Sequence, residues 1–255
     1  MTRDMEGAVV VVTGAGSGLG RCTATSLAER GATLVALDVD LAAAEATADA
    51  LDAMAVQADV TDPAAVARAR DAVLAEHGRV DGLVNNAGIL TKEPLLTESL
   101  AAWQRTLDIN VTGYFVCLQA FGAAMVEAGS GAIVNIASIG GTRPTIGAGA
   151  YCVSKAGVLA LTRQAALELG PSGVRVNAVS PGFMKTAMTA DRYAVSGLEE
   201  RRAQMIPLRR IASLDEVAAV VAFLLTPLAG YVSGEEIIVD GGFVQSTTAN
   251  VPQPT

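Results

Sequence analysis

The sequence has little histidine and little cysteine, and both shortages limit the sites that it can form. His77 is the only histidine among 255 residues, and it stands in an Ala-Glu-His-Gly segment that is typical of a helix end. A zinc cluster therefore lacks ligands, and a hydrolase with a Ser-His-Asp triad has only this histidine to use. Cys22, Cys117 and Cys152 are widely spaced, which favours reduced thiols over a disulfide framework. We expect no metal site and a reducing, cytoplasmic compartment.

Charged residues and long apolar runs are also scarce. Charged residues make up 17% of the chain, below the roughly 25% of average soluble proteins, so we expect partner subunits to cover part of the surface. The net charge of −8 repels phosphate backbones, so nucleic acid is not an expected partner. The longest apolar run, residues 217–225, is about half the roughly 18 residues that span a membrane. Asp4 and Glu6 replace the basic start of a secretory signal, so neither a membrane nor secretion is expected.

Seven short runs rich in Val, Ile and Leu alternate with helical patterns along the chain. Such runs are typical of strands buried on both faces, and their alternation with helices favours a parallel α/β sheet covered on both sides. No linker, repeat or change in composition divides the chain, so residues 1–255 are expected to form a single domain. The expected strands are residues 8–12, 33–37, 54–56, 82–84, 132–136, 174–178 and 237–239, and the expected helices are residues 18–30, 41–51, 63–76, 101–127, 151–169 and 214–225.

Local signals mark several ends of these elements, and two segments depart from the alternation. Ser213 with Glu216 forms a capping-box pattern, and Gly31, Gly78 and Gly170 are expected to be left-handed helix ends. Residues 183–210 have no strand pattern, and a long insertion beside site residues is typically a lid over the substrate. Residues 247–255 have no periodicity and are expected to be a frayed tail.

The first expected strand runs directly into a glycine-rich turn, TGAGSGLG at residues 13–20, which opens a helix. Glycines there let the backbone approach a pyrophosphate, and the helix N-terminus supplies free N–H donors. Asp38 ends the second strand, where a carboxylate accepts hydrogen bonds from ribose hydroxyls and repels a 2′-phosphate. Val39 follows it, with no arginine to bind that phosphate. The pattern predicts NAD rather than NADP, although a glycine turn alone is also compatible with a purely conformational role.

Tyr151 and Lys155 stand four positions apart in a helical pattern, so their side chains share one face. Lowering the tyrosine pKa from about 10 by about three units takes roughly 4 kcal/mol, which Lys155 and an oxidised nicotinamide can supply. Tyr151 then serves as general base toward an alcohol or general acid toward a ketone. Ser138 follows a strand at the carboxyl edge of the sheet, where its hydroxyl can hold the substrate oxygen. A surface Tyr-Lys pair and a loop-capping serine are the alternatives for these residues taken singly.

From residue 8 to residue 243 the sequence resembles the short-chain dehydrogenase/reductase family. The resemblance is carried by TGAGSGLG at 13–20, NNAG at 85–88, Asn110, Ser138, YCVSK at 151–155 and PGFMKT at 181–186. It implies a Rossmann fold with a doubly wound sheet of seven parallel strands, a nicotinamide cofactor and, commonly, a homotetramer. It also implies that Asn110 disrupts its helix and helps to hold a water that connects to Lys155. A buried asparagine satisfied by backbone groups is the alternative.

The same resemblance assigns cofactor contacts to residues at the strand ends. It implies that Asp59 meets the adenine amine and that Thr186 binds the nicotinamide carboxamide and so fixes which ring face meets the substrate. Without the resemblance, Asp59 is equally a solvated strand-end acid. The expected cofactor-binding residues are Gly14, Ser17, Gly18, Leu19, Gly20, Asp38, Val39, Asp59, Val60, Asn86, Ala87, Gly88, Tyr151, Lys155, Pro181, Gly182, Met184 and Thr186.

These observations predict an NAD-dependent oxidoreductase that interconverts a secondary alcohol and a ketone. A 3-oxoacyl-[acyl-carrier-protein] reductase is the alternative within the family, but such enzymes generally use NADPH and need a basic surface, for which Arg209 and Arg210 are thin support. A noncatalytic NAD-binding sensor is the alternative outside enzymes. The expected catalytic residues are Asn110, Ser138, Tyr151 and Lys155.

The substrate is expected to be a small apolar or moderately polar alcohol or ketone. Its pocket is shaped by Leu90 and by the lid at 183–210, whose methionines suit an apolar surface. The expected substrate contacts are Ser138, Ile139, Gly140, Tyr151 and Met188.

Overall fold

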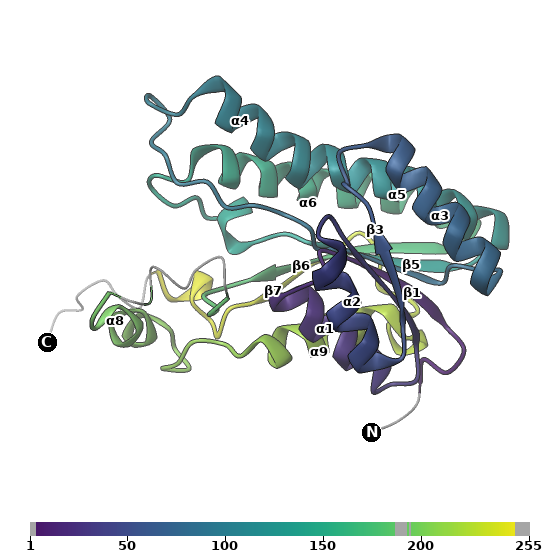
Figure 1. Cartoon of the computed structure of the whole chain (residues 1–255). Coiled ribbons are helices and arrows are strands. Elements are labelled where there is room, and N and C mark those ends of the chain that lie inside the picture. The colour runs from purple at the N-terminus through teal and green to yellow at the C-terminus, as the bar shows by residue number, and fades with distance from the viewer. Residues whose placement is uncertain (1–3, 187–192, 194, 248–255) are drawn as a thin grey trace, which may run out of the picture.

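The computed structural model describes residues 4–186, 193 and 195–247, and its seven parallel strands form one sheet (Figure 1). The strand order is β3-β2-β1-β4-β5-β6-β7, so the chain builds one half outward from β1 and then crosses over to β4. Open α/β sheets bind ligands beyond the carboxyl ends of the strands at such a switch point. The strands are β1 (Val9–Thr13), β2 (Thr33–Asp38), β3 (Met54–Gln57), β4 (Gly82–Asn85), β5 (Gly131–Ile136), β6 (Val174–Pro181) and β7 (Glu236–Val239).

Helices cover both faces of this sheet (Figure 1). One face carries α1 (Gly18–Ala28), α2 (Leu41–Leu51) and α9 (Leu214–Leu225). The other carries α3 (Pro63–His77), α5 (Gly113–Ala128) and α6 (Gly149–Leu169), with α4 (Leu100–Leu107) leading into α5. A short helix, α8 (Leu198–Met205), lies apart from these layers at one end of the sheet. The doubly wound α/β fold predicted from the sequence is confirmed.

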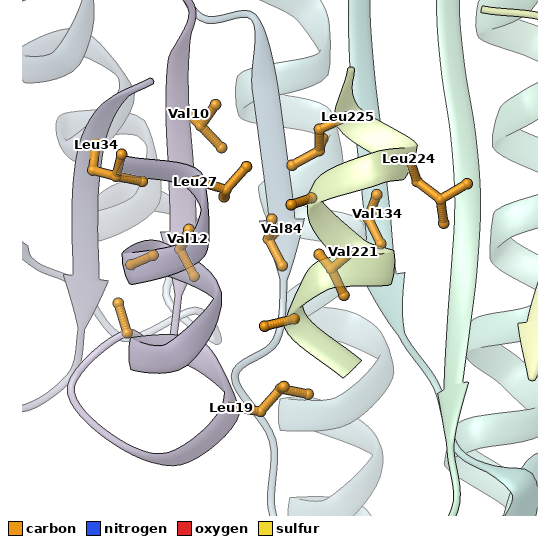
Figure 2. Close-up of a cluster of buried hydrophobic side chains, with 14 of the residues drawn as sticks. Val10, Val12, Leu19, Leu27, Leu34, Val84, Val134, Val221, Leu224 and Leu225 are labelled. Carbon is orange, nitrogen blue, oxygen red and sulfur yellow. The ribbon is translucent and has the colours of Figure 1, made fainter. Parts of the chain in front are cut away.

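The alternation of side chains along β1 explains the two layers. Val10 and Val12 face α1 and α9, where they pack with Leu27 and Val221 (Figure 2). Val9 and Val11 belong to the second core, with the buried side chains of α3 and α5. Successive residues of a strand point to opposite faces, so a continuous valine run is buried only when both faces are covered.

The predicted helix at residues 101–127 is interrupted in the structure. Residues Asp108–Thr112 form a π-helical turn between α4 and α5, and Asn110 lies at its centre. The prediction for Gly170 is wrong: its φ is −53°, and the left-handed residue is Gly173, with a φ of +77°, after one further 3₁₀ turn. Gly31 and Gly78 have positive φ, as predicted.

The stretch Leu100–Ala128 is long and apolar enough to cross a membrane by length and composition alone, with a mean hydropathy of 1.5. In the fold this stretch comprises α4, the π-helical turn and α5, and the inner side of α5 packs on the sheet. Phe121 and Met125 of α5 are fully buried, and they pack in the same core as the strands β4 and β5. Apolar composition on this side of the molecule therefore serves the packing of the sheet.

Candidate active site

A cavity of about 600 Å³ lies at the carboxyl ends of the strands. Its wall is formed by the turn after β1, the ends of β2 and β3, the loops after β4, β5 and β6, and the start of α6. The predicted cofactor residues that line it are Gly14, Ser17, Gly18, Leu19, Asp38, Val39, Asp59, Val60, Asn86, Ala87, Gly88, Tyr151, Lys155, Pro181, Gly182, Met184 and Thr186. Ser138, Ile139, Gly140 and Leu90 also line it.

Two predicted residues that the structure describes, Gly20 and Asn110, do not line the cavity. Gly20 lies behind the turn, where a Cβ would collide with the carbonyl oxygen of Gly14 and come within 2.6 Å of the Asn86 amide. Asn110 is fully buried, and its Oδ1 lies 3.1 Å from the point where a Cβ on Gly88 would stand. Met188 lies outside the described residues, as do 187, 189–192 and 194 of the predicted lid and 248–255 of the predicted tail.

The glycine-rich turn has the backbone that a phosphate site requires. Gly14 and Gly18 have φ of +64° and +54°, which are left-handed values that favour glycine. The N-cap of α1, Ser17, makes no side-chain capping bond, so the first N–H groups of the helix are left for another acceptor. Thr186 faces this turn, since its Cβ lies 3.9 Å from the point where a Gly18 Cβ would stand.

Asp38 is fixed at the end of β2 by the same turn. Its Oδ2 accepts a 2.8 Å hydrogen bond from the Gly16 N–H, and its Oδ1 accepts a 3.1 Å bond from the Asp40 N–H. A Cβ on Gly16 would come within 2.8 Å of Asp38 Oδ2, so glycine is required for this close approach. Within the described residues no cation pairs with Asp38, which leaves its negative charge facing the cavity. The turn and this carboxylate together fit a dinucleotide cofactor.

The segment after β4 holds the turn from the other side. Asn86 donates from its side-chain amide to the carbonyl oxygens of Thr13 and Gly14, at 3.0 and 3.1 Å. The hydroxyl of Thr13 accepts bonds from the backbone N–H groups of Asn86 and Ala87. These contacts tie β1 to β4 at the switch point. Asp59, by contrast, is exposed and accepts two bonds from Thr61 while it lines the far end of the cavity.

Tyr151 and Lys155 occupy one face of α6 and both line the cavity. The Lys155 ammonium lies 5.9 Å from the centre of the Tyr151 ring. It donates a 2.7 Å hydrogen bond to the carbonyl oxygen of Ile136 and a 3.4 Å bond to the hydroxyl of Tyr114. Burial lowers the pKa of Lys155 to about 7, because the charged ammonium loses its hydration.

Tyr114 is a part of the site that sequence reasoning missed. Its ring is fully buried, 5.1 Å from the Lys155 ammonium, and its hydroxyl donates a 3.1 Å bond to the carbonyl oxygen of Ile136. Burial, with the charges of Tyr151 and Cys117 nearby, raises its pKa well above the ordinary value. Tyr114 therefore stays protonated and remains a hydrogen-bond donor. The available signal was its position one helical turn after Asn110, which does not by itself distinguish a core tyrosine from a site residue.

Ser138 is the N-cap of a short 3₁₀ turn after β5 and lines the cavity, as Tyr151 does. Its Oγ accepts a 3.0 Å bond from the Gly140 N–H. A Cβ on Gly140 would stand 3.3 Å from Cys152 Sγ, 3.4 Å from Ser138 Oγ and 3.6 Å from the Tyr151 ring, so the side chains of Ser138 and Tyr151 both lie beside this glycine. Within the described residues Ser138 Oγ acts only as an acceptor, which leaves its proton available for an oxygen in the cavity.

Asn110 holds the helix break together rather than facing the cavity. Its side-chain amide donates to the Ile89 carbonyl oxygen and to Ser154 Oγ, at 2.9 and 3.0 Å, and its Oδ1 accepts a 2.8 Å bond from the Ile89 N–H. Ser154 in turn donates a 2.7 Å bond to the Tyr151 carbonyl oxygen. Asn110 therefore links the loop after β4 to the first turns of α6.

One wall of the cavity carries aromatic and cationic side chains of the predicted lid, 183–210, that were not named individually as site residues. Phe183, Tyr193 and Arg202 all line it, and Arg202 comes from α8. Arg202 lay inside the predicted lid, but only the folded chain places it beside two rings. The remaining lining residues absent from the prediction are Leu37, Ala58, Ile89, Lys92, Arg105, Ile109, Ile136, Ala137, Thr145, Ala148 and Cys152.

The chain is similar to known proteins over most of its length. The sequence profile of a family described as "Enoyl-(Acyl carrier protein) reductase" matches residues 14–244. D-threitol dehydrogenase of Mycolicibacterium smegmatis is 40% identical over 244 residues, with 94% of each chain covered. 3-Oxoacyl-[acyl-carrier-protein] reductase of Synechocystis is 40% identical over 243 residues, with 92% of this chain and 96% of the relative covered.

Two solved structures have the same fold. A protein described as ribose-5-phosphate isomerase from Brucella melitensis 16M superposes with a TM-score of 0.93 at 36% identity, with 100% of both chains covered. A short-chain type dehydrogenase/reductase from Mycobacterium marinum superposes with a TM-score of 0.89 at 33% identity, with 98% of both chains covered.

Proposed function

The chain belongs to the short-chain dehydrogenase/reductase family, and from that premise we propose that it uses NAD to interconvert a secondary alcohol and a ketone. Membership makes it an oxidoreductase that binds a nicotinamide cofactor and a small-molecule substrate. The observation that carries the finer proposal is that Ser138 and Tyr151 both lie beside Gly140 in the cavity, with Lys155 buried one helical turn beyond Tyr151.

Each of these side chains has one step in the proposed reaction. Ser138 donates a hydrogen bond from its hydroxyl to the carbinol or carbonyl oxygen of the substrate and so holds it in place, while its own proton stays on the serine. Tyr151 takes the hydroxyl proton of an alcohol, or returns it to a ketone. Lys155, when protonated, favours the phenolate of Tyr151 by its charge. A bound oxidised nicotinamide supplies the acceptor for the hydride that leaves the carbinol carbon.

Asp38 supports NAD over NADP. Both of its oxygens are already oriented by backbone N–H groups, and the carboxylate faces the cavity with no paired cation among the described residues. A 2′-phosphate there would meet a negative charge at short range. Arg21, which donates to the Gly16 carbonyl oxygen and to Thr47, does not line the cavity.

The experiment is NADH formation from NAD by purified protein, with aliphatic, cyclic, steroidal and sugar secondary alcohols. We expect turnover on one class of alcohol, a loss of about 10²- to 10⁴-fold in the Tyr151→Phe variant, and unchanged NAD binding in that variant. Tyr231→Phe is the matched control, because Tyr231 is fully exposed. Normal turnover by Tyr151→Phe would overturn the mechanism. An isomerase, the activity named for one similar structure, would change no nicotinamide absorbance.

A 3-oxoacyl-[acyl-carrier-protein] reductase is the second candidate, because a relative that is 40% identical to this chain carries that name. Such an enzyme must dock an acidic carrier protein on basic side chains. Arg210, one of two adjacent candidates, already forms a two-bond pair with Glu216 at 2.5 and 2.6 Å. Reduction of a carrier-bound 3-oxoacyl thioester with NADPH, faster than any free ketone, would favour this candidate. NAD binding without turnover of any substrate would favour a sensor.

The proposal includes a cytoplasmic homotetramer. Apolar side chains remain exposed on two helices, including Phe115 (43%), Val153 (47%) and Leu167 (75%), which contact with further copies of the chain would cover. Light scattering on the purified protein should give four times the 25.9 kDa chain mass. A monomer at micromolar concentration would contradict the assembly, and recovery outside the soluble cell fraction would contradict the location.

A further inference from the structure

The wall of the cavity at the end of β6 carries a cation whose position the chemistry described above does not use. Arg202, on α8, is half-buried and lines the cavity. Its guanidinium carbon lies 4.8 Å from the centre of the Phe183 ring and 4.9 Å from the centre of the Tyr193 ring. Two aromatic faces hold the group in place through cation–π contacts. Because the faces are occupied, the N–H groups at the edge are what the arginine can offer to a ligand.

The charge of Arg202 has no carboxylate partner in the part of the chain that the structure describes. The neighbouring acid on the same helix, Glu199, pairs with Lys185 instead. Tyr193 adds a second donor, because its hydroxyl is buried and has no hydrogen-bond partner among the described residues. The Arg202 guanidinium and the Tyr193 hydroxyl belong to side chains in contact. Both are hydrogen-bond donors that lack an acceptor among the described residues, so a ligand with acceptor atoms would satisfy them.

The position of this pair separates it from the cofactor end of the cavity. Phe183 follows β6, and β6 pairs with β5, which leads to Ser138. The acids that line the cavity, Asp38 and Asp59, lie at the ends of β2 and beyond β3, across the sheet. Among the described lining residues, the acids therefore lie at one end of the cavity, whereas Arg202 lies at the end next to Ser138. In a chain of net charge −8, an anionic substrate depends on such a local cation.

We propose that Arg202 and Tyr193 bind a carboxylate of the substrate, so that the enzyme acts on hydroxy acids and the matching keto acids. A planar carboxylate accepts two parallel bonds from the edge of one guanidinium, and a tyrosine hydroxyl supplies a third. The inference rests on the proposed function, because it names the class of alcohol that Ser138 and Tyr151 meet.

The test compares pairs of ketones that differ only in charge. 4-Oxopentanoate and 5-oxohexanoate are each measured against their methyl esters, with NADH and with NADPH. We expect wild-type kcat/KM to be higher for each acid than for its ester. Arg202→Gln should lower kcat/KM for the acids by about tenfold to a hundredfold, mainly through KM, and leave the esters unchanged. Tyr193→Phe should lower it for the acids by a smaller factor.

Arg201→Gln is the matched control, because Arg201 is exposed on the same helix and bonds the Ser196 carbonyl oxygen rather than lining the cavity. Arg202→Lys, which keeps the charge but loses the two-bond edge, should fall between wild type and Arg202→Gln. Equal losses for acid and ester in Arg202→Gln would show that the arginine only holds α8 in place. A preference for the ester in every wild-type pair would also overturn the inference.

Binding separates this inference from the proposed function. If neither acid nor ester is reduced, the proposed function fails for these ketones, and calorimetric titration of 4-oxopentanoate and 5-oxohexanoate into wild type and Arg202→Gln decides the carboxylate site. Binding to wild type that Arg202→Gln loses supports the site. No binding of either acid to wild type overturns it.

Discussion

Lys155 donates a 2.7 Å hydrogen bond to the carbonyl oxygen of Ile136, the last residue of β5. The bond ties α6 to the strand that leads, two residues later, to Ser138. The same carbonyl oxygen accepts from Tyr114, so one buried acceptor serves a cation and a phenol. Neutral partners do not replace the hydration that the ammonium loses, and the pKa of Lys155 falls to about 7.

Lys155 should therefore make stability depend on pH. Its pKa is about 7 in the folded protein and 10.5 when unperturbed, so the unfolded chain binds more protons between these values. The free energy of unfolding should rise with pH from about 7 to about 10.5, by up to about 1.4 kcal/mol per pH unit. Lys155→Met, which carries no proton, should be more stable than wild type at pH 6 and lose that advantage toward pH 10. Urea unfolding across this range measures the difference.

The control for that experiment is Lys185→Met. Lys185 is about half exposed and pairs with Glu199 on the surface, so removing it should not change the slope of stability against pH above 7. Parallel pH profiles for wild type and Lys155→Met would contradict the lowered pKa. The chain has only three lysines, Lys92, Lys155 and Lys185, so carbon-13 NMR of their Cε atoms can follow the titration directly.

Glu98 should position Tyr151 through the start of α6. The N-cap of this helix, Ala148, has no capping side chain, and Glu98 Oε2 accepts a 3.0 Å bond from the Ala150 N–H instead. Tyr151 is the next residue. Glu98→Ala should cost about 1 kcal/mol of unfolding free energy and lower kcat severalfold, because the first turn then frays. Thermal unfolding and steady-state kinetics measure both effects.

Glu98→Gln separates the hydrogen bond of this cap from its charge. Glutamine keeps a side-chain oxygen that accepts from the Ala150 N–H but removes the negative charge near the helix N-terminus. We expect Glu98→Gln to recover most of the stability and kcat lost in Glu98→Ala. If Glu98→Ala leaves both quantities unchanged, the loop before α4 has no positioning role.

The regular elements followed from local patterns in the sequence. The predicted bounds of α2 and α9 match the structure, and the predicted capping box of Ser213 and Glu216 is present. Such signals depend on neighbouring residues only. The π-helical turn around Asn110 did not follow from its helical pattern, because its geometry depends on Ile89 and Ser154, which are distant in sequence. The prediction of a left-handed helix end at Gly170 was wrong because the left-handed residue, Gly173, comes three residues later, after an added 3₁₀ turn.

Some residues of the candidate site were also predictable from local patterns in the sequence, and others required the structure. Tyr151, Lys155 and Ser138 stood out because motif spacing, helix periodicity and strand ends are visible in a sequence. Tyr114 is buried against Lys155, and Arg202 lies close to two aromatic rings. Both arrangements depend on elements that are distant in the sequence and come together only in the fold. The charge environment of a site therefore required the structure, although the identity of its central residues did not.

Asp38 should decide between the two cofactors. Asp38→Ala removes the carboxylate that accepts ribose hydroxyls and repels a 2′-phosphate. We expect the ratio of kcat/KM for NAD to that for NADP to fall by about tenfold to a hundredfold, from the loss of charge-assisted hydrogen bonds. Asp40→Asn is the control: it is exposed, and asparagine still caps α2. An unchanged ratio in Asp38→Ala would remove the ribose assignment.

Gly20 and Gly122 should respond in opposite directions to the same substitution. Both lie in helices, where alanine is intrinsically better by about 0.8–1 kcal/mol. A Cβ on Gly20, however, would collide with the Gly14 carbonyl oxygen and come within 2.6 Å of the Asn86 amide, whereas one on Gly122 meets nothing closer than 3.7 Å. Gly20→Ala should therefore lose about 1–3 kcal/mol of unfolding free energy and weaken NADH binding, because the turn must move. Gly122→Ala should gain up to about 1 kcal/mol and bind NADH normally. Urea unfolding and NADH fluorescence titration test the pair, and a stabilised Gly20→Ala that binds NADH as wild type does would show that the turn tolerates a side chain.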